Sequence, residues 1–402
     1  MRKTPLANNL MKKLSQSTTQ KNYSLGLVIC KNCNHIQLNT EVNPKLLFNH
    51  YSYKTGISTT MVNHFTKFSR DLCEYFDKKK KSYSDIKILD IGSNDSVLLD
   101  ILRSKGFKTF GVEPAFNLAK SSSHKIFNAF FDDKSIEKIY TQFGNFDVIT
   151  ANNVFAHTRD LNQFIKNIRY LLKEDGLISI EVQYLPNLIN NCYIDMIYHE
   201  HTSYHHLKPL NKLFKKYNLT LNSVSNISTH GGSMRIILNN TPENIISFNN
   251  KNESIDFIRN DNKFDQGILN SLNLLRERIE RIRLSLNTKL RELSKEYALL
   301  FGYSAPAKTV TLLSLLDKDI INKISFIIDD NELKQGRYIP RTKIPLISTN
   351  DAIERIYDRK SACIIFAWNM FEEISKKIII NNKLNPDILI SPLPEITIKK
   401  LK

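Results

Sequence analysis

The sequence predicts an α/β protein built on two doubly wound parallel sheets. Two stretches, one from about Ile86 and one from about Leu299, repeat the order apolar strand, turn, helix, which is typical of a parallel sheet covered by helices. The chain has 402 residues, of which 41% are hydrophobic and 24% charged. This length and composition indicate two or three globular domains and exclude a disordered or collagen-like chain.

A small N-terminal unit, over residues 1–66, is expected before these sheets. Residues 25–38 (LGLVICKNCNHIQL) alternate apolar and polar residues around Cys30 and Cys33, as a β-hairpin or a zinc ribbon does.

The first sheet is expected within residues 67–250. The run IKILDIGSND predicts a strand and a turn, and DSVLLDILRSKG predicts the helix behind them. Further strands are predicted in KTFGVEP, FDVITANNV and LISIEV. Right-handed crossovers bring the carboxyl ends of such strands to one edge of the sheet, where ligands bind.

One long amphipathic helix is predicted over residues 264–297, because apolar residues recur there every three or four positions without a proline. We interpret residues 251–298 as a connecting helix packed along a domain face, with a dimerising coiled coil as the alternative. The second sheet then falls in residues 299–402, with strands in ALLFGY, KISFIIDD, ACIIFAW and DILISPLP.

The formal net charge of +17 raises nucleic acid, an anionic membrane or a phosphorylated small molecule as partners. No aromatic RNA-binding motif accompanies the charge. No segment approaches the roughly 18 consecutive apolar residues of a membrane span, and five cysteines are too few and too scattered for a disulfide framework. We expect a cytoplasmic protein with neither membrane nor nucleic acid as its partner.

The strongest motif is ILDIGSNDSVLLD, followed by GVEP in the next predicted strand. Asp90 and Gly92 would let the backbone approach a ligand, and Glu113 would accept hydrogen bonds from ribose hydroxyls. The G-x-G-x-x-G pattern of dinucleotide sites is missing, and Asp90 and Asp95 would repel a pyrophosphate. The turn suits a ligand with a positive centre and a ribose, such as S-adenosylmethionine (AdoMet); a generic strand-to-helix turn is the alternative.

A second cluster lies in IDMIYHEHTSYHH, residues 194–206. His199 and His201 share a face on a strand but diverge on a helix, so they form an awkward pair for one metal ion. A solvated loop is a further alternative. We favour an acid/base site, because a histidine titrates near neutral pH and can be oriented by neighbouring carboxylate and phenol groups.

The chain resembles a known family in a series of motifs spread along its whole length. They are TPLANNL, VICKNCNHIQL, YSYKTGIS, DIGSNDSVLL, GVEPAFNLA, ANNVFAH, IYHEHTSYHHLKPL, HGGSMRI, GYSAPAK, IDDNELKQGRYIP and IIFAW. In this order they resemble the AdoMet-dependent sugar C-methyltransferases, which act on nucleotide-linked 4-keto-deoxysugars. The resemblance implies a zinc-binding N-terminal unit, a class I methyltransferase domain with a Rossmann-like sheet, and a second Rossmann-like domain that helps to hold the nucleotide sugar.

The resemblance also implies roles for individual residues. His201 would be the base that removes the proton next to the ketone of the sugar, with Tyr198 and Glu200 beside it. His157 and a tyrosine, Tyr51 or Tyr53, would complete the pocket. The residues that would hold AdoMet are Asp90, Gly92, Asn94, Glu113 and Asn153.

Three positions depart from the family pattern. Only Cys30 and Cys33 are present of two Cys-x-x-Cys pairs, and two cysteines cannot complete a tetrahedral zinc site, so we expect no metal and a truncated zinc-ribbon-like unit. Ser96 and Ser304 stand where glycines are expected. If either position needs a positive φ, binding of AdoMet or of the nucleotide would suffer.

The motif GYSAPAK, with Tyr303 and Lys308, would bind the substrate. It places Lys308 at the first turn of a helix, where a cation and backbone N–H groups suit a diphosphate. Arg337 could pair with a phosphate or stack on a base. A surface lysine and a solvated loop are the respective alternatives.

Together these observations predict an AdoMet-dependent C-methyltransferase of a nucleotide-linked keto-deoxysugar, in deoxysugar or polysaccharide biosynthesis. It would be a monomer or a weak homodimer. One alternative is a homologue that binds the nucleotide sugar but does not methylate it. The other is an RNA methyltransferase, which would explain the positive charge but gives no role to a second Rossmann-like domain.

Overall fold

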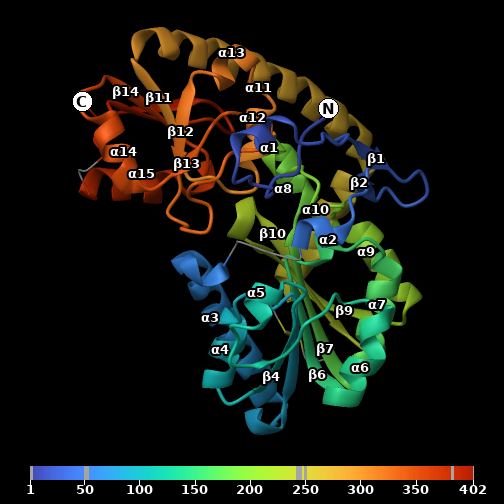
Figure 1. The fold of residues 1–402 in the computed structure, drawn as a ribbon. Helices are drawn as coiled ribbons and strands as arrows, with labels where there is room; N and C mark the ends of the chain where they lie inside the picture. Colours follow the sequence, from blue (N-terminus) through green and yellow to red (C-terminus); the bar gives the residue numbers. More distant parts are fainter. Residues whose placement is uncertain (1–2, 49–53, 241–246, 249–250, 382–383, 402) are drawn as a thin grey trace.

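The computed structural model describes residues 3–48, 54–240, 247–248, 251–381 and 384–401. These residues form a small N-terminal sheet and two large sheets, and each large sheet is covered by helices on both faces (Figure 1).

The first large sheet has seven strands in the order β5-β4-β3-β6-β7-β10-β9. Its strands are β3 (Lys87–Ile91), β4 (Lys108–Val112), β5 (Lys125–Phe127), β6 (Phe146–Asn152), β7 (Leu172–Gln183), β9 (Thr220–Ile227) and β10 (Ser233–Asn239). Strands β3 to β7 are parallel, as expected, whereas β10 runs antiparallel to both β7 and β9. A short turn, η5 (Thr229–Gly231), joins β9 to β10, because antiparallel neighbours need no crossover helix.

Helices cover both faces of this sheet because neighbouring strand residues point to opposite sides. On β3, Ile88 belongs to the core that contains residues of α3 and α4, and Leu89 belongs to the core that contains residues of α6, α7 and α9. The helices of this half are α3 (Thr59–Lys78), α4 (Val97–Ser104), α5 (Phe116–Ala119), α6 (Asp133–Phe143), α7 (Leu161–Leu171), α8 (Leu185–Asn190) and α9 (Leu207–Lys216).

The second large sheet has six strands in the order β13-β12-β11-β14-β15-β16, parallel except for the edge strand β16. The strands are β11 (Leu299–Tyr303), β12 (Ile324–Ile328), β13 (Leu346–Ile347), β14 (Ser361–Ile365), β15 (Ile388–Ser391) and β16 (Thr397–Lys400). The helices are α12 (Thr309–Leu313), α13 (Lys318–Ile321), α14 (Thr349–Ile356) and α15 (Phe371–Asn381). The expected doubly wound α/β architecture is therefore confirmed in both halves of the chain.

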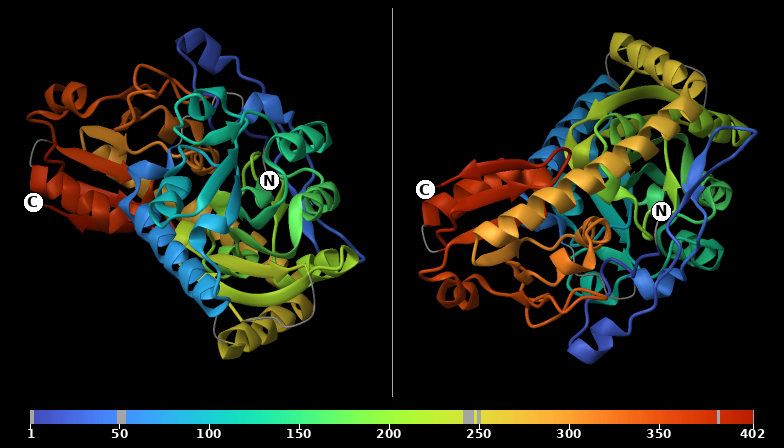
Figure 2. Two further views of the ribbon diagram at one scale, coloured as in Figure 1. Left: turned by 90° about the horizontal axis from the view of Figure 1, so that it is seen from below. Right: turned by 90° about the horizontal axis from the view of Figure 1, so that it is seen from above.

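The long amphipathic helix expected over residues 264–297 is found as α11 (Ile268–Glu296), but the connecting segment 251–298 is not one helix, because a separate helix, α10 (Lys251–Gln266), precedes α11. Gly267 separates them with φ −99° and ψ 11°, outside the helical range. Figure 2 shows α11 running along the molecule from one large sheet to the other. One apolar face of α11, which includes Leu286, Leu290 and Leu293, is buried in the chain's own core, and this argues against the coiled-coil alternative.

The N-terminal unit contains the expected β-hairpin, β1 (Leu27–Ile29) with β2 (Ile36–Leu38), and two short helices, α1 (Leu14–Thr18) and α2 (Pro44–Phe48). A third strand, β8 (Ser203–Tyr204), pairs with β2 and ties the hairpin to the histidine-rich segment. Cys30 and Cys33 lie in the turn between β1 and β2. The described residues include no zinc-ribbon site, since no group of three His, Cys, Asp or Glu among them could hold a metal ion.

Within the described ranges, no helix combines the length and the apolar character that crossing a bilayer requires.

A buried ion cluster joins the elements at the carboxyl end of β7. Glu181 is fully buried and accepts hydrogen bonds from Arg235 on β10 (2.6 Å), His64 on α3 (2.7 Å) and Thr229 of η5 (3.0 Å). Burial opposes the charge of this carboxylate, but the Arg235 guanidinium and the His64 hydrogen bond outweigh burial and lower the pKa of Glu181 to about 2. Two strands, a helix and a turn therefore depend on one carboxylate.

We expect Glu181→Gln to lower the free energy of unfolding by about 3–5 kcal/mol, because Arg235 would be left buried without a charge partner. Urea denaturation followed by circular dichroism measures this loss. The matched control is Glu296→Gln, which breaks the exposed ion pair with Lys360 and should cost less than about 1 kcal/mol. Equal stability of the two variants would show that the cluster contributes no more than a surface pair.

Candidate active site

One cavity of about 2100 Å³ collects most of the residues predicted from the sequence. It is lined from both large sheets, by residues at the carboxyl ends of β3, β4 and β6 and by residues that follow β11, β12 and β14. The predicted residues that line it are Asp90, Gly92, Asn94, Glu113, Asn153, His157, Tyr198, His201, Tyr303 and Lys308. Tyr51 and Tyr53 lie outside the described residues.

The turn after β3 is shaped for close approach of a ligand. Asp90, at the end of β3, accepts a hydrogen bond of 2.6 Å from Thr150, and burial raises its pKa to about 7. Gly92 has φ +69°, and a Cβ built there would lie 2.4 Å from Val154 Cγ2. Only glycine fits this position without displacing a neighbour.

Glu113, directly after β4, is held by the same turn. Its two carboxylate oxygens accept the backbone N–H groups of Asn94 and Ala115, each at 2.8 Å, and burial raises its pKa. Each oxygen has a further lone pair for a ligand hydroxyl.

Several buried polar atoms in the cavity wall have no hydrogen-bond partner among the residues that the structure describes. Buried polar groups are almost always paired, so these atoms fit a polar ligand such as AdoMet. They are Ser93 Oγ, Asp95 Oδ1, Asn152 Oδ1 and Gln183 Nε2.

The two serines that replace expected glycines both adopt the left-handed conformation, Ser96 with φ +66° and Ser304 with φ +63°. Both positions therefore need the positive φ at which a serine in place of glycine was expected to impair binding. A non-glycine residue pays roughly 1–2 kcal/mol for this conformation. Ser96 Oγ also lies 2.7 Å from Ser122 Oγ, so a hydrogen bond offsets part of that cost.

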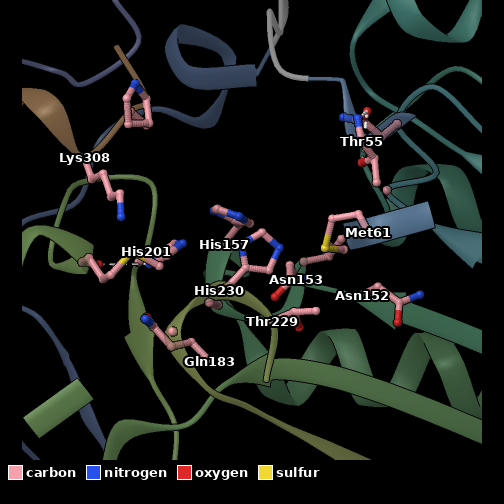
Figure 3. Close-up of a pocket in the computed structure, with 18 of the residues that line it drawn as sticks. Thr55, Met61, Asn152, Asn153, His157, Gln183, His201, Thr229, His230 and Lys308 are labelled. Atoms are coloured by element: carbon pink, nitrogen blue, oxygen red, sulfur yellow. Dashed lines mark hydrogen bonds between the residues drawn. The ribbon is translucent and has the colours of Figure 1, made fainter. Parts of the chain in front are cut away.

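His201 lies in the loop between η4 (Ile194–Met196) and β8, and its ring enters the cavity (Figure 3). Its Nδ1 is 3.1 Å from the carbonyl oxygen of Met196, and its Nε2 is 3.1 Å from the Tyr198 hydroxyl. A carbonyl oxygen can only accept, so in the neutral ring Nδ1 carries the proton and Nε2 accepts the Tyr198 O–H. The ring is thus set up as a base through Nε2.

Two more histidines lie beside His201 (Figure 3). His157, in η3 (Phe155–His157), donates from Nδ1 to the Glu200 carbonyl at 2.6 Å, and its ring centroid is 5.0 Å from that of His201. His230, in η5, has φ +54°. Burial, and then repulsion by His157 among other contacts, keeps the pKa of His201 well below 6.5; burial also lowers the pKa of His157 and His230. The cluster is therefore neutral near pH 7.

The other members of the YHEH segment point elsewhere. The Glu200 side chain, expected beside the base, lies outside the cavity lining and accepts a hydrogen bond from Asn8 (2.6 Å), and the Glu200 backbone carbonyl accepts one from His157. His199 donates to the Ser24 carbonyl at 3.1 Å. The Glu200 and His199 side chains are buried, which excludes the solvated-loop alternative. His199 and His201 point to different partners, which argues against a shared metal ion.

Of the residues predicted to bind the substrate, Tyr303 and Lys308 line the cavity. Tyr303 donates to Asp330 at 2.9 Å. The Lys308 side chain is only 11% exposed, so the surface-lysine alternative is wrong. Arg337 lies outside the cavity lining, because its guanidinium turns back to the Leu333 carbonyl at 2.8 Å.

Several cavity residues had no role in the sequence prediction. His230 sits in HGG, where a histidine before two glycines indicates a special turn and could have drawn attention. Gln183 and Trp368 also line the cavity, and Asp195 is buried beside Lys308 outside the cavity lining. None of these three residues received a role, because only the tertiary fold brings them to the histidines or to Lys308.

We expect Gly92→Ala to weaken binding of AdoMet at least tenfold, because the new methyl group must displace Val154 beside Asn153. Isothermal titration calorimetry measures the dissociation constant. The control is Gly336→Ala, which also has a positive φ (+72°) but has nothing within 4 Å of the added Cβ. Equal affinity of both variants for AdoMet would show that the collision at Gly92 does not affect cofactor binding.

Comparisons with known proteins relate both halves of the chain to methyltransferases. Residues 63–224 match a family described as a methyltransferase domain, and residues 228–392 match one described as a C-methyltransferase C-terminal domain. The chain is 29% identical to the C-methyltransferase NovU of Streptomyces niveus over 398 residues, which cover 98% of this chain and 91% of that protein.

Other likenesses are shorter. The mitochondrial ubiquinone biosynthesis O-methyltransferase of Bos taurus is 32% identical over 108 residues, which cover 25% of this chain and 29% of that protein. The solved structure of an S-adenosylmethionine-dependent methyltransferase from Clostridium acetobutylicum is 12% identical, with a TM-score of 0.37, and the match covers 44% of this chain and 92% of that one.

Two family models follow one another along this chain in the order methyltransferase domain, then C-methyltransferase C-terminal domain, and the likeness to a C-methyltransferase extends over nearly its full length. These matches support the assignment of the chain as an AdoMet-dependent C-methyltransferase.

Proposed function

We propose that this enzyme methylates the carbon next to the ketone of a nucleotide-linked 4-keto-deoxysugar. The observation that carries the proposal is the neutral His201, whose Nε2 faces a cavity lined by both large sheets. Methylation at carbon requires a carbon nucleophile, and a carbon next to a ketone becomes one when a base removes its proton.

His201 would be that base. Its Nδ1–H is held by the Met196 carbonyl, so Nε2 is the atom that can take the proton. Burial and the neighbouring His157 disfavour the charged ring before substrate binds. The resulting enolate carries its charge on oxygen and needs a donor, which the Tyr198 hydroxyl can supply once it turns from His201 Nε2.

The residues of the first sheet would hold AdoMet, which supplies an electrophilic methyl group on a sulfonium centre. Glu113 would accept ribose hydroxyls, and Gly92 and Asn94 would let the backbone approach the ligand. Asp90 and Asn153 line the same end of the cavity. Serine at position 96 leaves this turn intact, with the backbone in the left-handed conformation.

The nucleotide would lie along the second sheet, near Tyr303 and Lys308. Lys308 brings the positive charge that a diphosphate requires. Tyr51 and Tyr53 remain predicted members of the sugar site. We likewise propose the unit boundaries near residues 66, 250 and 298, a cytoplasmic location and a monomer or weak homodimer.

The second candidate is a homologue that binds the nucleotide sugar without methylating it. The observation that favours it is the serine at both left-handed positions, 96 and 304. Calorimetry separates the two candidates, since failure to bind millimolar AdoMet would support the non-methylating homologue. An RNA methyltransferase would instead bind RNA with an affinity that falls steeply as salt rises.

We expect transfer of one methyl group from AdoMet to a member of a panel of nucleotide-linked 4-keto-6-deoxysugars, detected by mass spectrometry. His201→Asn should lower the rate by a factor of about 10²–10⁴, the usual contribution of a general base. The matched control is His199→Asn, which changes a histidine of the same segment that faces Ser24 and should keep most of the activity. If no sugar gains a methyl group with the unaltered enzyme, the proposed substrate class is wrong.

The dependence of kcat/KM on pH gives a further prediction. The base must be neutral, and the pKa of His201 is lowered by burial and by His157, so the rate should stay at its plateau at pH 6.5 and fall only under more acidic conditions. A profile of kcat/KM between pH 5 and 8 measures the midpoint. A midpoint at or above pH 6.5 would contradict a buried neutral base.

A further inference from the structure

We infer that Asp195 is a positioning residue, through which the C-terminal half of the chain holds His201 in the tautomer that can act as a base. The inference rests on the proposed role of His201, but the contacts that carry it join residues that no sequence motif had linked.

Asp195 is a carboxylate buried at the junction of the two halves. It is fully buried in η4, and one of its oxygens accepts the Trp368 Nε1–H at 2.5 Å and lies 3.6 Å from Lys308 Nζ. Its other oxygen has no hydrogen-bond partner in the described part of the chain. A buried, incompletely paired carboxylate is costly, and such a group is rarely kept for stability alone.

The partners of Asp195 are themselves fixed at the carboxyl edge of the second sheet. Lys308 Nζ lies 4.2 Å from the centre of the Trp368 ring and 2.6 Å from Asn369 Oδ1. The Tyr193 ring packs against Trp368, with centroids 4.7 Å apart. These contacts hold the indole N–H and the ammonium group on Asp195, while Lys308 still lines the cavity.

A further contact ties the other end of the same turn. Thr311, on α12, donates to the carbonyl of Ile197 at 3.4 Å. The C-terminal half thus contacts the η4 turn on both sides of Met196, at Asp195 and at Ile197.

Met196 links these contacts to His201. It follows Asp195 directly, and its carbonyl accepts the Nδ1–H of His201 at 3.1 Å. The two neutral tautomers of histidine differ little in energy, so the acceptor at Nδ1 decides which one is present. If η4 moves, the proton can shift to Nε2, and a protonated Nε2 cannot take a proton from the substrate.

The first test reads the tautomer directly and needs no substrate. Long-range ¹H–¹⁵N NMR spectra of protein labelled at histidine nitrogens, assigned with His201→Asn, should show His201 protonated at Nδ1. We expect Asp195→Asn, which removes the charge, and Trp368→Phe, which removes the N–H, to shift His201 toward a mixture of tautomers. The matched control is Asp319→Asn, which breaks an exposed contact with Arg291 and should leave the spectrum unchanged.

The second test separates positioning from binding. Once the methyl-transfer assay has identified a sugar substrate, kcat can be measured for the variants. Asp195→Asn and Trp368→Phe should lower kcat tenfold or more, within the contribution of a general base. The dissociation constant for AdoMet should stay within about twofold of the unaltered enzyme, since no AdoMet contact is removed. Any rise in the KM for the sugar, caused by the altered contacts of Lys308, should be smaller than the fall in kcat. Asp319→Asn should keep the full kcat.

The outcomes distinguish this inference from the proposed function. An unaltered enzyme that methylates no keto-sugar contradicts the proposed substrate, but the NMR comparison still decides the role of Asp195. A His201 tautomer that is the same in both variants and in the control overturns the inference, as does a loss confined to KM. Circular dichroism of both variants identifies any unfolding, and two chemically different changes at one contact guard against a single variant that fails to fold.

Discussion

The structure depends above all on the buried carboxylate of Glu181. It sits where β7 ends, at the edge of the sheet that carries the cavity, and it gathers a guanidinium, an imidazole and a hydroxyl from three other elements. A charge in this position is tolerated only because each of its oxygens is satisfied. The cluster thereby fixes η5, the turn that contains His230, and α3, the helix that contains His64. The same interactions thus stabilise part of the cavity lining and the core of the sheet.

The cavity itself follows from placing two parallel sheets with their carboxyl edges toward each other. Strand ends in such sheets leave turns whose backbone N–H groups point outward, and the structure uses left-handed residues to make these turns tight. Gly92, Ser96 and Ser304 all have this conformation. At Gly92 a neighbouring side chain also forbids any Cβ, whereas the two serines bear a conformational cost that glycine would avoid. A C-methyltransferase with these serines keeps the geometry of both turns.

In the histidine cluster, burial sets the protonation state of His201 and the backbone sets its tautomer. Burial removes water from His157, His201 and His230 and makes the neutral ring the stable form. Backbone carbonyls then decide which nitrogen keeps the proton, Met196 for His201 and Glu200 for His157. The neutral charge state and the tautomer thus have separate physical origins, and the Glu200 side chain accepts a hydrogen bond from Asn8.

The sequence by itself determined the features that depend on neighbouring residues. Strand and helix periods predicted both large sheets, and the turn after β3 and the acid after β4 were placed correctly, because an apolar strand followed by a glycine and an acid has few other readings. Tertiary structure alone decided where side chains from distant segments point. Gly267 divides a helix that looked continuous, Arg337 turns away from the cavity, and Asp195 meets Trp368 across 173 positions of the chain. Such contacts depend on how the two large sheets pack against each other, and no local pattern of residues encodes that packing.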